Sequence, residues 1–211
     1  MRYDRFKHHR RSVRPQKWDY SSVGPYYVTI LTKRMESIFG HIKNGNMILN
    51  DIGKIAHRYW YSLPEKYDMI DLDEFQIMPN HLHGVVIIKK RITPPVREIH
   101  EFPLREGMSM RPANFQFSLD STKDPFIAWR NYRRRMLLFK IMGFYKMNSA
   151  KEINIVRNTK GANVWHRSFH DEIIRNPKHF QNVRKYIRNN PKNWDKDENN
   201  PVNIKKSRKR K

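Results

Sequence analysis

The spacing of apolar and polar positions predicts a strand followed by a helix at the start of the chain. Residues 26–32 are rich in aromatic and β-branched side chains and follow the turn pair Gly24-Pro25, which is typical of a β-strand. After Asn50, apolar residues recur at helical spacing until Leu63-Pro64. This pattern predicts an amphipathic helix that Asn50 caps.

The remaining patterned segments alternate between extended and helical spacing. Residues 72–78 and 83–88 predict two adjacent antiparallel strands, because a turn signal separates them. Three later segments predict a helical region with a candidate break at Gly143, a loosely alternating strand, and a final helix. They span residues 125–157, 164–174 and 177–190, and Pro191 prevents continuation of the last one.

The resulting order is β, α, β, β, α, β, α, and its first six elements follow the ferredoxin-like split βαβ order. We therefore expect an α+β fold with a ferredoxin-like sheet and a trailing helix. A length of 211 residues suits one folded domain with extensions. We expect a basic arm at residues 1–20, a domain at 21–194 with an inserted loop at about 91–124, and a basic tail at 195–211.

Composition points to a polyanionic partner. The net charge is +23, from 43 Lys and Arg against 20 Asp and Glu, which favours nucleic acid over a merely solvated surface. The mixed apolar and basic second helical region places Arg133, Arg134 and Arg135 as candidate phosphate contacts. No run of 18 apolar residues and no secretory signal is present, so we expect no membrane association and a cytoplasmic, nucleoid-associated location.

The absence of cysteine removes disulfides, thiolate nucleophiles and Cys-based zinc sites, so the candidate chemistry rests on other side chains. His81 and His83 begin a predicted strand, where alternation points both imidazoles to one side and Leu82 to the other. On the last helix, Tyr186 and Asn190 are one turn apart and share a face. Two histidines alone are half a metal site.

An amide oxygen from Asn190 can complete that site for a divalent ion and leave positions open for a phosphate oxygen and water. Mg²⁺ or Mn²⁺ suits this task. A tyrosine hydroxyl, with an ordinary pKa of about 10, is a poor nucleophile at neutral pH unless the phosphate is polarised. This set of residues can support metal-assisted attack of Tyr186 on phosphorus, whereas each residue taken alone is more often a packed or surface side chain.

The segment from Met78 to His83 resembles the His-hydrophobic-His motif of the IS200-like, HUH-type transposases, in particular the REP-associated tyrosine transposase branch. Three further blocks resemble that family's opening strand, late strand and tyrosine helix, in the same order. They are residues 24–29, 164–175 and 186–191.

The resemblance implies His81 and His83 as metal ligands, Tyr186 as the nucleophile and Asn190 as the third ligand. It also implies cleavage of single-stranded or hairpin DNA through a 5′-phosphotyrosine bond, in transposition or in the processing of repeated palindromes. Dimers occur in this family, and a homodimer allows the tyrosine to serve either subunit's histidines. The sequence leaves that choice open.

Two other functions are compatible with the same residues. One is a domesticated nucleic-acid-binding protein that keeps the fold and the basic surface without cutting. The other is a metal-dependent hydrolase in which water attacks phosphorus and Tyr186 only packs. A covalent protein–DNA intermediate distinguishes both from the tyrosine nuclease.

Overall fold

The computed structural model describes residues 18–90 and 134–203. The chain divides into two compact units, one of Met1–Tyr20 with Thr93–Met136 and one of Ser21–Ile92 with Leu137–Lys211. In the first unit, the described residues are 18–20 and 134–136, where the Tyr20 backbone N–H lies 3.4 Å from Met136 Sδ. The second unit contains the sheet and the candidate site.

Within the described residues, four strands form one antiparallel sheet in the order β4-β5-β1-β6. They are β1 (Gly24–Leu31), β4 (Ile70–Met78), β5 (His81–Ile88) and β6 (His170–Ile173). The strand β5 lies between β1 and β4, and β1 lies between β5 and β6. The two strands of each βαβ unit are therefore separated by one strand of the other unit. This is the ferredoxin-like arrangement that the order of elements predicts.

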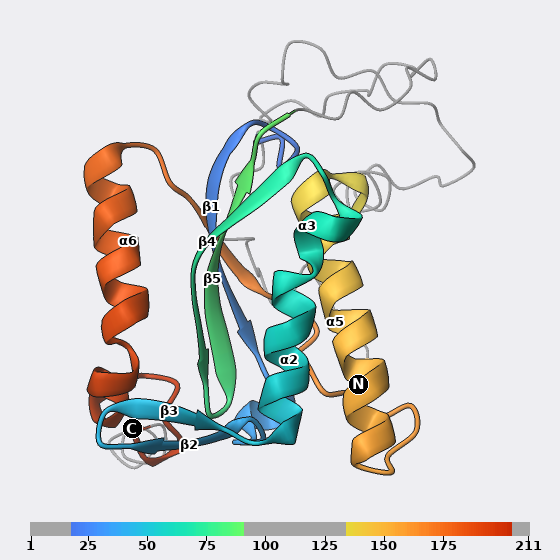
Figure 1. Ribbon diagram of the computed structural model, residues 1–211. Helices are drawn as coiled ribbons and strands as arrows, with labels where there is room; N and C mark the ends of the chain where they lie inside the picture. Colours follow the sequence, from blue (N-terminus) through green and yellow to red (C-terminus); the bar gives the residue numbers. More distant parts are fainter. Residues whose placement is uncertain (1–17, 91–133, 204–211) are drawn as a thin grey trace, which may run out of the picture. The chain divides into compact units, whose positions relative to one another are not determined.

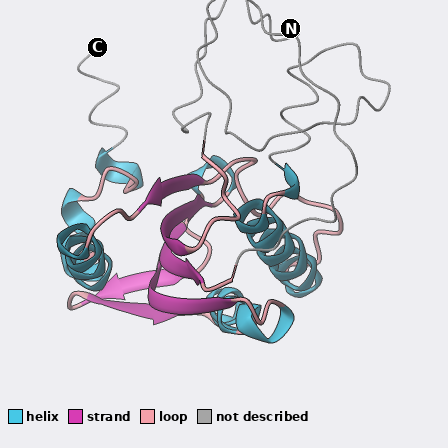
Figure 2. Cartoon of the chain, turned by 90° about the horizontal axis from the view of Figure 1, so that it is seen from above, coloured by secondary structure: helices cyan, strands magenta, loops and turns pink. Residues whose placement is uncertain are grey.

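Helices cover both faces of the sheet. The crossover helices α2 (Asp51–Tyr61) and α5 (Leu137–Val156) pack side by side on one face, and α6 (Pro177–Asn189) lies on the other (Figures 1 and 2). The predicted cap at Asn50 is confirmed, because its side chain accepts a hydrogen bond from the Gly53 N–H, and Asn176 caps α6 in the same way through the His179 N–H. A short helix, α3 (Leu63–Lys66), follows α2, so Pro64 opens a further turn.

Strand alternation divides the core between the two faces. Residues of β1 and β5 that face α2 and α5 are buried aromatic or aliphatic side chains, apart from Gly84, where an added Cβ would lie 2.3 Å from Trp60 Cζ2. The opposite face packs on α6 through a smaller apolar cluster. It consists of Tyr27, Val85, Ile174, Val183 and Ile187. His81 and His83 belong to this second face.

Two predicted features of the second half are wrong. Gly143 does not break α5, which runs through it. An added Cβ at this position would have no atom within 4 Å, and the helix is held by its buried neighbours Ile141, Met142 and Tyr145. The strand predicted at 164–174 is shortened to β6. Trp165 forms an isolated bridge to Thr32 and turns inward, with Nε1 donating to Ser149 Oγ at 3.0 Å, so the following residues leave the ladder.

Two folded segments lie outside the predicted pattern. The hairpin of β2 (Gly40–Lys43) and β3 (Asn46–Leu49) turns at Asn44 and Gly45, both with positive φ, and this Asn-Gly pair is the local signal for it. After α6, the helix η2 (Pro191–Lys196) continues the fold. Residues 195–203, predicted as part of a tail, are therefore folded, whereas 1–17, the predicted insert at 91–124 and 204–211 lie outside the described residues.

Candidate metal centre and tyrosine

The two histidines of β5 form the floor of the candidate site. Their strand register pairs His83 with Thr29 and His81 with Leu31, so both imidazoles face α6, as alternation predicts. Their Nε2 atoms lie 2.9 Å apart. Both side chains are buried, at 0% and 2% exposure, so neither is a chance surface histidine.

Hydrogen bonds at the opposite ring nitrogens hold both imidazoles in place. His81 Nδ1 lies 2.8 Å from Asn80 Oδ1. Asn80 is oriented in turn, because its Nδ2 donates to the carbonyls of Met35 and Asn199 at 3.1 and 2.8 Å. Its oxygen must therefore accept, which places the proton of neutral His81 on Nδ1.

Two hydroxyl groups of β1 hold His83 in a similar way. Its Nδ1 lies 2.6 Å from Tyr27 Oη and 2.9 Å from Thr29 Oγ1. In the tautomer where Nδ1 donates to one of these oxygens, Nε2 of His83 carries a lone pair that faces Nε2 of His81 and can bind a cation. Such partners orient metal-binding histidines in known sites.

The electrostatics of the pair fit a cation. Burial lowers the pKa of His81 to about 3, and burial together with neighbouring His81 and His170 lowers the pKa of His83 well below its ordinary value. Both rings are therefore neutral at physiological pH. When both Nε2 atoms carry lone pairs, a cation between them offsets their repulsion at 2.9 Å, and the donor set suits a divalent metal.

Asp197 is the residue of this site that the sequence patterns miss. One of its ligand atoms and one from each histidine all lie within 4.8 Å of one another, and Oδ2 lies 3.7 Å from His81 Nε2. Oδ1 accepts from the Asn199 backbone at 2.6 Å. Among the described residues, Oδ2 is buried without a hydrogen-bond partner, and burial raises the pKa of this carboxyl group. A buried acceptor without a hydrogen-bond partner is expected of a metal ligand, because a bound metal ion would satisfy it.

Tyr186 and Asn190 approach the histidines from α6. The Tyr186 ring lies edge-on to His83, with centroids 5.3 Å apart, and its side chain is about half exposed, at 47% for the residue. Asn190 is buried, and within the described part of the chain its Oδ1 has no hydrogen-bond partner. The pKa of Tyr186 is raised above its ordinary value of 10, because burial and nearby Asp197 outweigh the hydrogen bonding to Asn190 and Tyr27 that lowers it.

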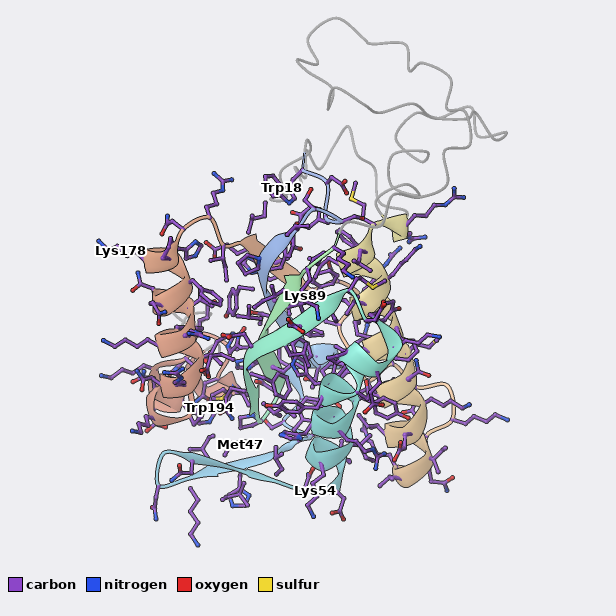
Figure 3. The ribbon with its side chains drawn as sticks, turned by 45° about the horizontal axis from the view of Figure 1, so that its top comes forward. Trp18, Met47, Lys54, Lys89, Lys178 and Trp194 are labelled. Atoms are coloured by element: carbon purple, nitrogen blue, oxygen red, sulfur yellow. The ribbon has the colours of Figure 1, made fainter. Side chains whose placement is uncertain are left out.

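The structure thus brings His81, His83 and Tyr186 together, and Asn190 lies within hydrogen-bonding reach of Tyr186 and Asp197. Trp194 of η2 adds a tilted ring 6.0 Å from that of His81, at the end of α6 opposite to Lys178 (Figure 3). The predicted phosphate contacts Arg134 and Arg135 are exposed residues of the other unit, and Arg133 lies outside the described residues. No spacing pattern in the sequence marks Asp197, which directly follows η2.

No protein-family model matches the chain. A protein of Haemophilus influenzae, whose own function is uncharacterised, is 31% identical over 197 residues, which cover 93% of this chain and 96% of that one. The chain belongs to the same family as this protein. Among solved structures, the chain is similar to a REP-associated tyrosine transposase bound to a REP hairpin, with 13% identity and a TM-score of 0.44. That match covers 88% of this chain and 74% of the transposase.

Among the described residues, every helix is too short or too polar to cross a membrane.

Proposed function

We propose that the protein is a metal-dependent endonuclease that cuts single-stranded or hairpin DNA with Tyr186 as the nucleophile. The observation that carries the proposal is the half-exposed Tyr186 edge-on to His83, beside paired neutral imidazoles and an unsatisfied carboxylate. An ordinary core has no reason to gather these groups, because each buried unpaired acceptor costs free energy. The net charge of +23 supports a nucleic-acid substrate.

His81 and His83 would hold the metal through Nε2, with the Asp197 carboxylate as a third ligand and the Asn190 amide oxygen as a fourth. The two oxygen ligands suit Mg²⁺ or Mn²⁺. When bound, the metal withdraws charge from the scissile phosphate and stabilises the negative charge of the transition state.

The chain's own residues supply the nucleophile and its orientation. Tyr186 Oη attacks phosphorus, a bond forms between them, and the bond from phosphorus to the 3′ oxygen breaks. The phenolic proton is lost to solvent, and the departing oxygen takes up a proton to become a 3′-hydroxyl. The products are a 5′-phosphotyrosine and a free 3′ end, and the reverse steps rejoin the strand without a high-energy cofactor.

Labelled single-stranded hairpin DNA from the repeats that flank the gene tests this function. We expect Mn²⁺ or Mg²⁺ to give a labelled band at protein size on a denaturing gel, which chelator and Tyr186→Phe both abolish. Tight DNA binding without adduct or cut product would favour the non-catalytic binding protein. Cleavage that survives Tyr186→Phe would identify water as the nucleophile and a hydrolase.

A further inference from the structure

A β-bulge in β4 turns two consecutive acidic side chains toward the tyrosine helix. The pairing of β4 with β5 shifts register between Leu72, opposite Val86, and Phe75, opposite Gly84. Asp73 and Glu74 therefore both lie opposite a single residue of β5. In a regular strand, consecutive side chains point to opposite faces, so only one of these carboxylates would reach α6 without the bulge.

Both carboxylates pair with arginines of α6 that are one helical turn apart. Arg184 Nε donates to Asp73 Oδ1 at 2.7 Å, and Nη2 donates to Oδ2 as the second half of a bidentate pair. Arg188 Nε donates to Glu74 Oε1 at 2.6 Å, and Nη2 donates to the same oxygen. The Asp73 and Glu74 side chains are 14% and 22% exposed, but Arg184 is 29% and Arg188 is 60% exposed, so the Asp73–Arg184 pair is the better shielded of the two.

These ion pairs lie across the helix from the nucleophile. Val183 and Ile187 form the buried stripe of α6 against the sheet. At 100° per residue, Arg184 and Arg188 fall on one side of that stripe and Tyr186 falls on the other. Contacts on one flank therefore fix the rotation of the helix about its axis, and this rotation sets where the Tyr186 hydroxyl lies.

We propose that Asp73 and Glu74 are positioning residues that act through Arg184 and Arg188 to hold Tyr186 over the histidines, an inference that rests on the proposed function. A roll of about 10° would move an atom some 8 Å from the helix axis by roughly 1.4 Å. Misplacement of a reacting atom by about 1 Å can slow a reaction on the order of 100-fold.

Substitution on the acidic side separates positioning from DNA binding. The double variant Asp73→Asn/Glu74→Gln makes the protein more positive, so its affinity for DNA does not fall for electrostatic reasons. Glu74→Gln has a matched control in Glu152→Gln. The Glu152 carboxylate pairs with Arg58 between α5 and α2, so this control makes the same chemical change away from α6.

Two readouts decide the proposal. The first is the rate of adduct formation on labelled hairpin DNA with Mn²⁺, at saturating DNA, alongside the DNA affinity. We expect the double variant to be about 10- to 100-fold slower, with equal or tighter DNA binding, and Glu152→Gln to match wild type. The second is amide hydrogen exchange across residues 177–189, which we expect to be faster in the variants of Asp73 and Glu74 and unchanged in Glu152→Gln. Wild-type rate and unchanged exchange would overturn the proposal.

The design keeps the two proposals apart. If the double variant loses its cooperative thermal transition, Glu74→Gln against Glu152→Gln makes the same comparison. If wild type forms no adduct with any metal or repeat, the proposed nuclease function fails. Hydrogen exchange then tests by itself whether Asp73 and Glu74 hold α6 in place. Faster exchange in α6 of the variants supports this role, and unchanged exchange refutes it.

Discussion

The Tyr186 ring lies edge-on to the His83 ring of its own chain, with centroids 5.3 Å apart. The helix that carries Tyr186 packs on the same chain's sheet through Val183 and Ile187. This arrangement matters because a nucleophile and a metal centre in one chain need no partner subunit. We therefore expect catalysis in cis.

Mixing two inactive variants tests the cis arrangement. Tyr186→Phe lacks the nucleophile and His83→Ala lacks a histidine of the metal centre, so neither forms an adduct alone. Because each chain is expected to use its own tyrosine, an equimolar mixture should stay inactive in the hairpin adduct assay. Recovery of adduct on the His83→Ala chain would show that the tyrosine acts in trans. Each variant is first checked for folding by circular dichroism.

Asp197→Asn is expected to have opposite effects on metal binding and on apo stability. Loss of the charged ligand should weaken Mn²⁺ binding by about tenfold or more, measured by calorimetry. Burial raises the pKa of this carboxyl group, so its ionised form opposes folding at neutral pH. The metal-free variant should therefore unfold at an equal or higher temperature than wild type. A lower melting temperature without weaker metal binding would assign Asp197 a purely structural role.

Tyr27→Phe is expected to weaken Mn²⁺ binding without touching a ligand. Tyr27 Oη lies 2.6 Å from His83 Nδ1, and loss of such outer-shell partners typically costs about 10- to 100-fold in affinity. Because Thr29 remains at 2.9 Å, we expect a loss near tenfold, at the lower end of that range.

Tyr145→Phe is the matched control for that variant. Its hydroxyl donates to the Ala56 carbonyl at 3.1 Å on the opposite face of the sheet. We expect this substitution to lower stability by about 1 kcal/mol and to leave metal affinity unchanged. Equal metal affinity in Tyr27→Phe and Tyr145→Phe would show that Tyr27 does not orient His83.

The ion pair between Asp73 and Arg184 predicts a pH-dependent contribution to stability. Hydrogen bonding from Arg184 lowers the pKa of Asp73 below its ordinary value of 3.8. A carboxyl group with a lowered folded-state pKa stabilises the fold above its ordinary pKa, and the contribution is lost as the pH falls through the folded value. Asp73→Asn should therefore cost about 1 kcal/mol at pH 7.

Urea unfolding at two pH values measures this difference. The gap in unfolding free energy between wild type and Asp73→Asn should be present at pH 7 and should shrink as the pH falls below 3.8. An equal gap at both pH values would mean that packing, rather than the charge of Asp73, accounts for the loss.

Local chemistry allowed several parts of this protein to be read from the sequence. The cap at Asn50 depends on a side chain that reaches the next turn, and the two-residue period of a strand places His81 and His83 on one face. The order of elements was sufficient to predict the split βαβ sheet. Each inference rests on residues close together in the chain, where backbone geometry alone relates them.

Only the tertiary structure decided the contacts that join distant segments. Asp197 reaches the histidines because η2 turns the chain back toward β5, and no periodicity in the sequence encodes that return. Alternation by itself would send Asp73 and Glu74 to opposite faces, and a bulge placed both on α6. Turns and bulges of this kind are set by the packing of the whole domain. The sequence alone therefore identified the histidines and the tyrosine, whereas only the fold added Asp197 and the acidic pair on β4.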